Sequence, residues 1–412
     1  MNIFYNLAIS AYALGAKLIA HRNKKAALMV EGQARTFETL KEKIDSGERC
    51  VWIHASSLGE FEQGRPLIEM IRRQHPELKL LLTFFSPSGY EVRKNYSGAD
   101  VICYLPFDTP GRVRRFLQLA RPEMAIFVKY EFWGNYLQEL QRLGVPCYII
   151  SSIFRPGQIF FRPWGGMFRT MLRRFSHIFV QDDDSLRLLA GIGVENVTVA
   201  GDTRFDRVTD ILAGCKPFPI VERFTADSAF TLIIGSSWQP DEDIVIPYFN
   251  SHPGMKLIIA PHEFDTPRLQ ALIERIERPV RLYSEATEEN VAGCDCLIID
   301  CFGILSSCYR YAQVAHVGGG FGVGIHNVNE AAVYGIPVTF GPNYHKFREA
   351  RELVACEGGF EVADKAAFDS LMNRFMSDPA YLSKHGKIAG DYIHSHLGAT
   401  QKIYDFLKKR HL

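Results

Sequence analysis

Two carboxylates in the first half of the chain follow predicted strands, at positions where a side chain can act on a ligand. Glu60 closes the run HASSLGE (54–60), whose small residues let a ligand approach the backbone. Glu131 lies in the run KYEFWGN (129–135), beside large aromatic side chains. Two carboxylates at neighbouring strand ends can divide acid–base and orienting roles. Each motif also has a structural explanation. Glu60 could simply complement the dipole of the helix that it begins. Phe132 and Trp133 could start the core-facing side of a helix.

A glycine-rich run, GGGFGVG (318–324), follows a predicted strand in the second half. Such glycines expose backbone N–H groups to phosphate, although no acidic residue closes the next strand as the dinucleotide fingerprint requires. The residues that follow, His326 to Glu330, place a carboxylate near a helix start, where it can accept hydrogen bonds from ribose hydroxyls. A capping box with Asn327 as N-cap and Glu330 three residues later explains the same spacing, so both interpretations stay open.

The elements that carry these loops alternate between short apolar runs and amphipathic stretches, which is typical of parallel strands covered by helices. Strands are predicted at 51–55, 78–84, 101–106, 124–128, 147–151, 178–180, 197–200, 230–234, 256–260, 296–299, 314–317 and 337–340. Helices are predicted at 62–74, 112–120, 241–249, 267–276, 304–311, 328–334 and 347–355.

The length of 412 residues exceeds what a single core of about 250–300 residues serves, so we expect two domains. The segment 206–227 lacks a strong strand pattern and contains Pro217 and Pro219, which makes it the predicted linker. The predicted fold is α/β: two Rossmann-like doubly wound domains, 26–205 and 228–390, facing across a cleft that binds ligands. A C-terminal helical segment at 391–412 could return to the first domain.

The composition is that of an ordinary globular protein, with 47% hydrophobic and 23% charged residues. A net charge of +1 gives no support for nucleic acid as a partner. The nine cysteines are scattered, odd in number and without paired CxxC spacing, which indicates free thiols in a reducing cytosol rather than a metal site. The crowded Cys294, Cys296, Cys301 and Cys308 surround what looks like a buried strand.

The segment 1–25 is predicted to be a membrane-associating helix. From Ile3 to Ala20 it is apolar or small except for Asn6, Ser10 and Lys17, and the basic run HRNKK (21–25) follows. A secretory signal would carry its positive charge before the apolar run, and a spanning helix needs about 20 apolar residues. A monotopic anchor fits better, with its basic residues on anionic headgroups. The alternative is a helix packed on the protein's own core.

Taken together, the motifs make the chain similar to the transferases of 3-deoxy-D-manno-octulosonic acid (Kdo), which are inverting glycosyltransferases of the two-domain GT-B type. The resemblance runs from about Val51 to the C-terminus. The motifs that carry it are HASSLGE (54–60), TFFSPSG (83–89), LPFD (105–108), EFW (131–133), GDTRFD (201–206), HNVNE (326–330), GIP (335–337) and GP (341–342).

The resemblance implies roles for particular residues. Glu60 matches the family's general base, and Glu131 and Arg204 match positions that support the transition state. The residues implied in CMP binding are Pro261, His262, Phe302, Gly303, Ile304, Asn327, Val328, Asn329 and Glu330. The chain departs from the family's usual residues at Lys129-Tyr130, Gly134, Arg204 and Ile304.

The resemblance also implies an activity: transfer of Kdo from CMP-Kdo to a lipid A precursor, lipid IVA, in lipopolysaccharide synthesis. No metal and no cofactor are expected. The place would be the cytoplasmic face of the inner membrane of a Gram-negative cell, with the lipid surface as a partner. Candidates for contact with lipid phosphates are Arg155, Arg162, Arg169, Arg173 and Arg174, for which a solvated basic face is the alternative. Two other functions stay open, a UDP-sugar transferase or epimerase and an inactive membrane-tethered binding protein.

Overall fold

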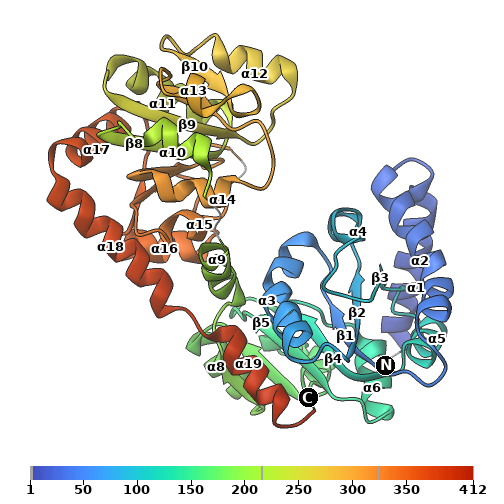
Figure 1. Ribbon diagram of the computed structural model, residues 1–412. Coiled ribbons are helices and arrows are strands. Elements are labelled where there is room, and N and C mark those ends of the chain that lie inside the picture. Colours follow the sequence, from blue (N-terminus) through green and yellow to red (C-terminus); the bar gives the residue numbers. More distant parts are fainter. Residues whose placement is uncertain (1–2, 215–216, 323, 412) are drawn as a thin grey trace. The chain divides into compact units, whose positions relative to one another are not determined.

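Two compact units make up the chain (Figure 1). The computed structural model describes residues 3–214, 217–322 and 324–411, so Cys215 and Val323 of the glycine-rich run lie outside the described residues. Unit 1 is Met1–Arg207 with Leu397–Leu412, and unit 2 is Val208–His396. Each unit contains a seven-stranded sheet in which every described pairing is parallel. The predicted fold class, two doubly wound α/β units of the GT-B type, is confirmed.

The sheet of unit 1 reverses its strand order next to its first strand. Its spatial order is β3-β2-β1-β4-β5-β6-β7. The carboxyl ends of β1 and β4 therefore flank the switch point, where open α/β sheets bind ligands. The strands are β1 (Cys50–His54), β2 (Lys79–Phe84), β3 (Val101–Tyr104), β4 (Pro122–Val128), β5 (Cys147–Ser152), β6 (His177–Val180) and β7 (Val197–Val199).

Alternate side chains of these strands enter two separate cores, one on each face of the sheet. Trp52 and Phe127 belong to one core, and Ile53 and Ile126 to the other. Burial on both faces explains why the strands are continuous apolar runs in the sequence. The covering helices are α3 (Leu58–Gln74), α4 (Pro87–Arg93), α5 (Pro110–Ala120), α6 (Gly134–Arg142), η1 (Ile159–Phe161), α7 (Gly166–Leu172), α8 (Asp183–Ala190) and α9 (Thr203–Ala213).

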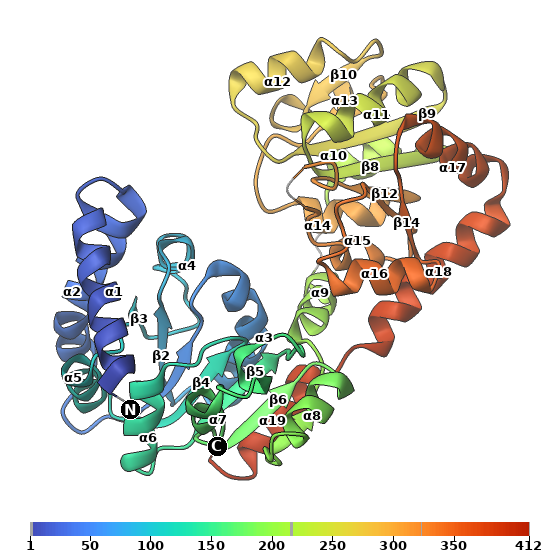
Figure 2. The same cartoon turned by 180° about the vertical axis from the view of Figure 1, so that it is seen from behind.

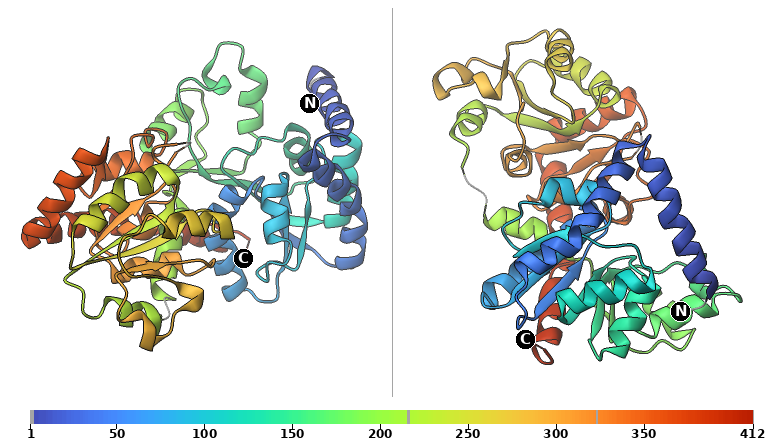
Figure 3. Two further views of the ribbon diagram at one scale, coloured as in Figure 1. Left: turned by 90° about the horizontal axis from the view of Figure 1, so that it is seen from above. Right: turned by 90° about the vertical axis from the view of Figure 1, so that its right-hand side faces the viewer.

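Two N-terminal helices, α1 (Ile3–Ala20) and α2 (Lys24–Lys43), form a helical hairpin in unit 1 (Figures 1 and 3). Asn23 caps α2 by accepting the N–H of Ala26 at 3.1 Å. Ala16 is the buried residue of α1, whereas most of the helix's large apolar side chains are exposed. α1 is long and apolar enough to cross a membrane.

The C-terminal helix α19 (Ala399–Lys408) belongs to unit 1, although α18 (Pro379–Ser395) before it belongs to unit 2. Residue 391, where the C-terminal segment was predicted to begin, lies inside α18. Asp206 accepts the N–H groups of Gly398 and Thr400, and Tyr404 of α19 hydrogen-bonds His75 at the end of α3. These contacts fix the returning chain on unit 1.

Unit 2 repeats the architecture with the order β10-β11-β9-β8-β12-β13-β14. Its switch point lies between β8 and β12. The strands are β8 (Phe230–Ser237), β9 (Met255–Pro261), β10 (Val280–Leu282), β11 (Cys296–Ile298), β12 (Val314–Val317), β13 (Val338–Phe340) and β14 (Gly359–Glu361). The other elements are α10 (Pro219–Thr225), α11 (Gln239–Ser251), α12 (Thr266–Ile273), η2 (Tyr283–Glu285), α13 (Glu288–Val291), α14 (Leu305–Cys308), η3 (Tyr309–Tyr311), α15 (Asn329–Ala332), α16 (Arg348–Ala355) and α17 (Lys365–Ser377).

Candidate active site

The switch point of unit 1 brings together His54 and Glu131, which are far apart in the sequence. His54 is the last residue of β1, and β1 pairs with β4, whose loop carries Glu131. The Nε2 atom of His54 lies 3.0 Å from Oε2 of Glu131, and its Nδ1 atom lies 3.1 Å from the carbonyl oxygen of Thr83. Nε2 also faces the Trp133 indole N–H at 3.3 Å, and Nδ1 faces the Thr83 hydroxyl at 2.9 Å, so contacts on both nitrogens hold the ring in place.

Glu131 is held as a carboxylate although it is only 7% exposed. Burial opposes its ionisation, but hydrogen bonds from His54, Ser56 and the Trp133 indole outweigh burial and lower the pKa of Glu131. Trp133 also packs against Phe85, with ring centroids 4.8 Å apart. Glu131 therefore supplies a fixed negative charge at the end of β4.

Glu60 occupies the third position of α3 and completes a capping box with Ser57. Its Oε2 atom accepts the N–H of Ser57 at 3.1 Å, and its own N–H faces the Ser57 hydroxyl. The pKa of Glu60 is raised, first by burial and then by the negative charge of Glu131, while His54 opposes the shift. Two neighbouring carboxyl groups whose pKa values move in opposite directions are the arrangement by which enzymes separate a proton acceptor from a fixed charge.

The backbone at this edge of the sheet is strained at two residues other than glycine. Lys129 follows β4 with φ 67°, and Ser151 near the end of β5 has φ 54°, both in the left-handed region. Such conformations cost about 1–3 kcal/mol each and gather at functional sites. Lys129 is tied to β5, since its N–H donates to Ile150 and its carbonyl accepts from the Ser152 hydroxyl.

Arg204 is the second residue of α9 and lies in the same unit as the two glutamates. Its guanidinium donates to Asp202 at 2.7 and 3.0 Å, and Gln63 of α3 donates to the same carboxylate. Burial opposes ionisation of Asp202, but Arg204 outweighs it and lowers the pKa of that carboxyl. Burial raises the pKa of the Tyr130 hydroxyl, and the positive charges of Arg155 and Arg204 oppose that rise. Tyr130 directly precedes Glu131. The structure thus gathers Glu60, Glu131 and Arg204 around α3 and the loop after β4.

Three of the five arginines proposed for lipid phosphates bind the protein's own backbone. Arg169 donates to the carbonyl groups of Phe160 and Arg162, and Arg173 donates to Ile192. Arg174 donates to Gly134 at 3.4 Å. These contacts give Arg169, Arg173 and Arg174 structural roles that their spacing in the sequence did not reveal.

In unit 2, Asp241 organises the loops at the switch point, a role that was not predicted from the sequence. Its Oδ2 atom accepts the N–H of Trp238 at 2.8 Å and that of Gly319 at 3.0 Å. His316 Nε2 lies 3.5 Å from the other oxygen. Burial opposes ionisation of Asp241, but His316 and the two N–H donors outweigh it and lower the pKa. The signal that could have found Asp241 is its place three residues after Trp238, directly beyond a strand.

The glycine-rich run is required by the close approach of other backbone. A β-carbon at Gly318 would lie 2.4 Å from the carbonyl oxygen of Ser236, and one at Gly320 would lie 2.5 Å from the nitrogen of Gly341. Beside the run is a cavity of about 190 Å³. It is lined by Trp238, Pro240, Asp241, Gly319, Phe321 and Gly322.

The predicted residues Pro261 and His262 lie at the end of β9, next to this cavity's Trp238. The His262 ring stacks on Trp238 with centroids 4.5 Å apart and lies 4.7 Å from the His326 ring. Burial and His262 lower the pKa of His326, so this aromatic stack favours uncharged imidazole. The predicted Phe302 is 85% exposed and contacts Phe264, while Gly303 and Ile304 lead into α14.

The capping-box interpretation of Asn327 and Glu330 is wrong. α15 begins at Asn329 with Val328 as N-cap and no side-chain cap. Asn327 instead accepts the N–H of Asn329 at 3.2 Å and donates its amide to Glu330 at 3.0 Å. Asn329 is fully buried, and neither polar atom of its side chain has a partner among the described residues. A buried amide without hydrogen-bond partners calls for an explanation, and a bound ligand that pairs with the amide is one.

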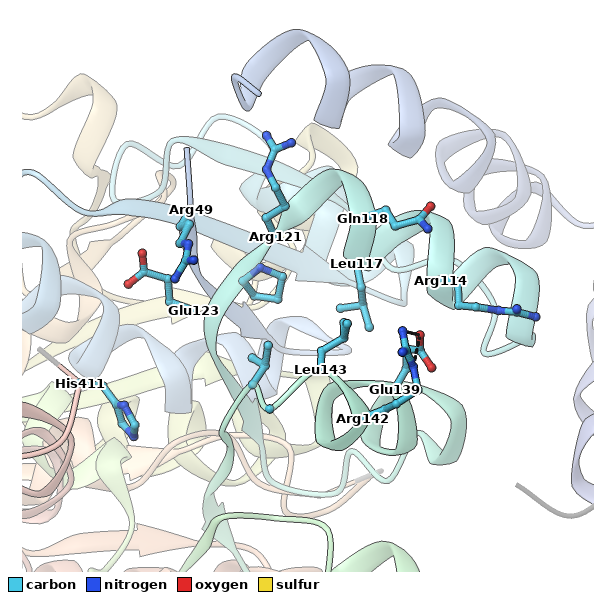
Figure 4. A pocket seen from close by; sticks show the side chains of 13 residues that line it. Arg49, Arg114, Leu117, Gln118, Arg121, Glu123, Glu139, Arg142, Leu143 and His411 are labelled. Carbon is cyan, nitrogen blue, oxygen red and sulfur yellow. Dashed lines mark hydrogen bonds and ion pairs between the residues drawn. The ribbon is translucent and has the colours of Figure 1, made fainter. Parts of the chain in front are cut away.

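A separate hollow of about 580 Å³ lies at the amino-terminal ends of the unit 1 strands, opposite the switch-point loops (Figure 4). Its lining includes Pro122, the first residue of β4, and Arg49, which precedes β1. Arg142 in its wall pairs with Glu139. This edge carries the amino ends of the strands, away from Glu60 and Glu131. Within the described parts of both units, no group of three or more His, Cys, Asp or Glu side chains could hold a metal ion.

Comparison with known proteins identifies sequence relatives along most of the chain. The family model described as 3-deoxy-D-manno-octulosonic-acid transferase (kdotransferase) matches residues 31–207. A 3-deoxy-D-manno-octulosonic acid transferase of Aquifex aeolicus is 26% identical, over 90% of this chain and 99% of the relative. One of Bordetella pertussis is 28% identical, over 87% of this chain and 86% of the relative.

Solved structures share the fold at low sequence identity. A UDP-GlcNAc 2-epimerase of Neisseria meningitidis, bound to UDP-GlcNAc, has a TM-score of 0.60 at 15% identity, covering 87% of this chain and 100% of its own. MurG of Acinetobacter baumannii has a TM-score of 0.56 at 11% identity, covering 88% of this chain and 99% of its own. At such identities the likeness shows the two-unit architecture alone.

Proposed function

Because the chain is a glycosyltransferase of the Kdo transferase family, we propose that it moves Kdo from CMP-Kdo to a lipid A precursor, lipid IVA, in lipopolysaccharide synthesis. One observation carries the proposal. Glu60, with its raised pKa, lies beside the hydrogen-bonded Glu131–His54 pair at the switch point of a sheet within the matched residues 31–207.

Glu60 acts as the general base in the proposed reaction. It takes the proton of the acceptor hydroxyl as that oxygen forms a bond to the anomeric carbon of Kdo, and the bond from that carbon to the CMP phosphate oxygen breaks. A single displacement inverts the configuration. Glu131 holds His54 in place, and Arg204, which is paired with Asp202, lies in the same unit. Fixed charges of this kind stabilise developing charge without reorganisation.

Unit 2 holds the nucleotide in this proposal. Asn329 offers a buried amide to the cytidine part, and Glu330 offers a carboxylate to ribose hydroxyls. The N–H groups of Gly318, Gly319, Gly322 and Gly324 donate within unit 2, so the glycine-rich run serves the nucleotide in this proposal by shaping the loop, and no metal ion is invoked. The proposed CMP-binding set is Pro261, His262, Phe302, Gly303, Ile304, Asn327, Val328, Asn329 and Glu330.

The acceptor is amphiphilic, so we place the protein on the cytoplasmic face of the inner membrane of a Gram-negative cell. α1 supports this placement, because most of its large apolar side chains are exposed and the basic run 21–25 follows it. A monotopic helix with that distribution binds anionic lipid through both apolar burial and charge.

The proposal is tested by mass analysis of products formed by the full-length protein from CMP-Kdo and lipid IVA in detergent micelles. We expect the acceptor mass to rise by one or more Kdo residues, with UDP-GlcNAc as the control donor and a chelator as the test of metal independence.

Glu60→Gln should lower turnover by about 10²–10⁴-fold while CMP binding stays intact. Glu62→Gln, on the same helix and paired with Arg93, is the matched control and should stay active. Transfer from UDP-GlcNAc but not from CMP-Kdo would overturn the donor assignment.

A further inference from the structure

The first N–H groups of α6 are capped by residues from distant parts of unit 1. Trp133 is the N-cap of α6 and makes no side-chain cap. Instead, Asp108 accepts the N–H of Asn135 at 3.0 Å and that of Tyr136 at 2.9 Å. The N–H of Gly134 donates to the hydroxyl of Tyr5 at 3.0 Å. The start of α6, three residues beyond Glu131, is therefore fixed by residues from other elements.

The inner face of α1 supplies part of this cap. Tyr5 donates its hydroxyl hydrogen to Asp108 at 2.5 Å, and Asn6 accepts from the Asn135 amide at 2.8 Å. Figures 1 and 2 show the N-terminal end of α1 next to α6. On the other side of the helix, Phe4 and Leu7 are exposed. At its N-terminal end, α1 thus has apolar side chains toward solvent on one side, and Tyr5 and Asn6 bound to the start of α6 on the other.

The side chain of Asp108 is fully buried, so water cannot stabilise its negative charge. Burial raises the pKa of Asp108 to about 6, while hydrogen bonds from Tyr5, Asn135 and Tyr136 oppose that rise. Burial and Asp108 together raise the pKa of Tyr5, so its hydroxyl stays a donor. The buried carboxylate is stabilised through these donors, and Tyr5 is the one that α1 contributes.

The fixed start of α6 leads directly to the candidate site. Trp133 immediately precedes Gly134, and its indole N–H donates to Oε2 of Glu131. The same oxygen faces His54. A displacement of Gly134 would move Trp133, and with it one of the groups that keep Glu131 ionised.

We propose that Tyr5 is a positioning residue: its hydroxyl, with Asp108, holds Gly134 and Trp133 so that Glu131 stays in its catalytic place. The proposed membrane helix is then also a part of the catalytic scaffold. This inference rests on the proposed function for its kinetic test, but its geometric part can be tested without activity.

The geometric test uses indole N–H resonances of the full-length protein, which has four tryptophans. Trp133→Phe assigns the resonance of Trp133. Tyr5→Phe, which keeps the ring and removes the hydroxyl, should shift that resonance and speed hydrogen exchange of the Gly134 amide by about tenfold, as expected for one lost hydrogen bond. Tyr12→Phe is the matched control, because it lies on the same helix and no hydrogen bond of its hydroxyl occurs among the described residues. An unchanged Trp133 resonance in Tyr5→Phe would overturn the proposal.

The kinetic test is a double-mutant cycle on Kdo transfer. Tyr5→Phe should lower kcat about five- to tenfold with little change in KM for CMP-Kdo, whereas Tyr12→Phe should not. In the Trp133→Phe background, Tyr5→Phe should have almost no further effect, because the hydroxyl acts through the indole. Full additivity of the two substitutions would contradict a shared path. A wild-type protein that makes no Kdo product would refute the proposed function, and the resonance and exchange measurements would still decide the role of Tyr5.

Discussion

Glu60 and Glu131 are the same residue type in one small region, yet the structure gives them opposite tendencies to ionise. Burial and the charge of Glu131 raise the pKa of Glu60, while donors around Glu131 lower its own. A general base must be ionised, so activity should be lost as pH falls through the raised pKa of Glu60. We expect the acidic limb of kcat/KM to lie above the ordinary glutamate value of 4.5, measured from pH–rate profiles of the full-length protein. A limb at or below that value would contradict the role.

Removal of the charge on Glu131 should move that limb. In Glu131→Gln the second-largest cause of the raised Glu60 pKa is gone, and it exceeds the opposing effect of His54. The acidic limb of kcat/KM should therefore shift to lower pH, although kcat itself falls by about tenfold or more because His54 loses its partner. Thr39→Ser, on the distant helix α2, is a neutral control. A limb that stays in place would show that Glu131 does not act on Glu60.

Asn329 offers a different kind of residue-scale test, because its buried amide has no partner among the described residues. An unsatisfied buried polar group costs about 1–3 kcal/mol, so Asn329→Ala should leave the free energy of unfolding of the unliganded protein nearly unchanged. If CMP satisfies the amide, the same substitution should weaken CMP binding by about tenfold. Thermal unfolding and calorimetry with CMP measure the two effects. A large loss of stability with unchanged CMP affinity would assign Asn329 to folding alone.

At the scale of elements, the strands were predictable because burial on both faces makes them continuous apolar runs, as in Ile53 and Ile126. The strands β10 and β14 were missed because they are three-residue edge strands whose residues are mostly half-buried or exposed. The helix predicted from 328 begins one residue later, at Asn329, but Asn327 as its N-cap was wrong, since Asn327 bonds Glu330 side chain to side chain. No local pattern reports such contacts.

The two glutamates at the switch point of unit 1 could be named from the sequence, but their contacts could not. HASSLGE and EFW marked Glu60 and Glu131 as residues of interest. Nothing in the sequence places His54 at 3.0 Å from Glu131, because that contact depends on the pairing of β1 with β4. The contact of Tyr5 was not predictable for the same reason, since its partner Asp108 lies 103 positions later in the sequence.

Asp241 joins two elements, α11 and the loop after β12, by accepting the N–H groups of Trp238 and Gly319. Asp241→Asn removes the charge and turns one oxygen into a donor, which weakens both bonds. Hydrogen bonds to charged groups contribute about 1.5–3 kcal/mol, so thermal stability should fall, and CMP affinity should fall about tenfold with it. Asp243→Asn, on the same helix and largely exposed, should have little effect on CMP affinity. Equal affinities in Asp241→Asn and wild type would show that the glycine-rich run does not serve the nucleotide.

Across the whole molecule, the two units use one local design for two purposes. In each, the first strand of the sheet leads into a helix whose third residue is an acid that accepts the N–H of the N-cap residue: Glu60 from Ser57, and Asp241 from Trp238. Asp241 also binds Gly319 and faces His316, so its charge serves the scaffold. Glu60 lies beside another carboxylate instead, and its raised pKa suits proton transfer. Identical spacing therefore leaves the role undecided until the neighbours are known.

The membrane proposal is also a property of the whole molecule, because α1 must serve the lipid with one face while Tyr5 and Asn6 on its other side stay bound to the start of α6. Leu7, Leu14 and Leu18 are 59% to 65% exposed, so their replacement by serine should leave the fold and the Tyr5–Asp108 contact intact. Each buried leucine side chain contributes about 1.5–3 kcal/mol, so even partial insertion predicts at least about a hundredfold loss of binding to anionic vesicles in the triple variant.

Vesicle flotation measures this binding, and higher salt should weaken binding of the wild type as well, because the proposed anchor places Lys17, Lys24 and Lys25 on anionic headgroups. Leu143→Ser is the matched control, since Leu143 is 47% exposed but lies beyond α6, away from α1. Equal flotation of the triple variant and the control would refute α1 as the membrane contact. If the triple variant loses flotation but keeps the Trp133 indole resonance of the wild type, the two faces of α1 act independently, and anchoring and positioning are separate functions of one helix.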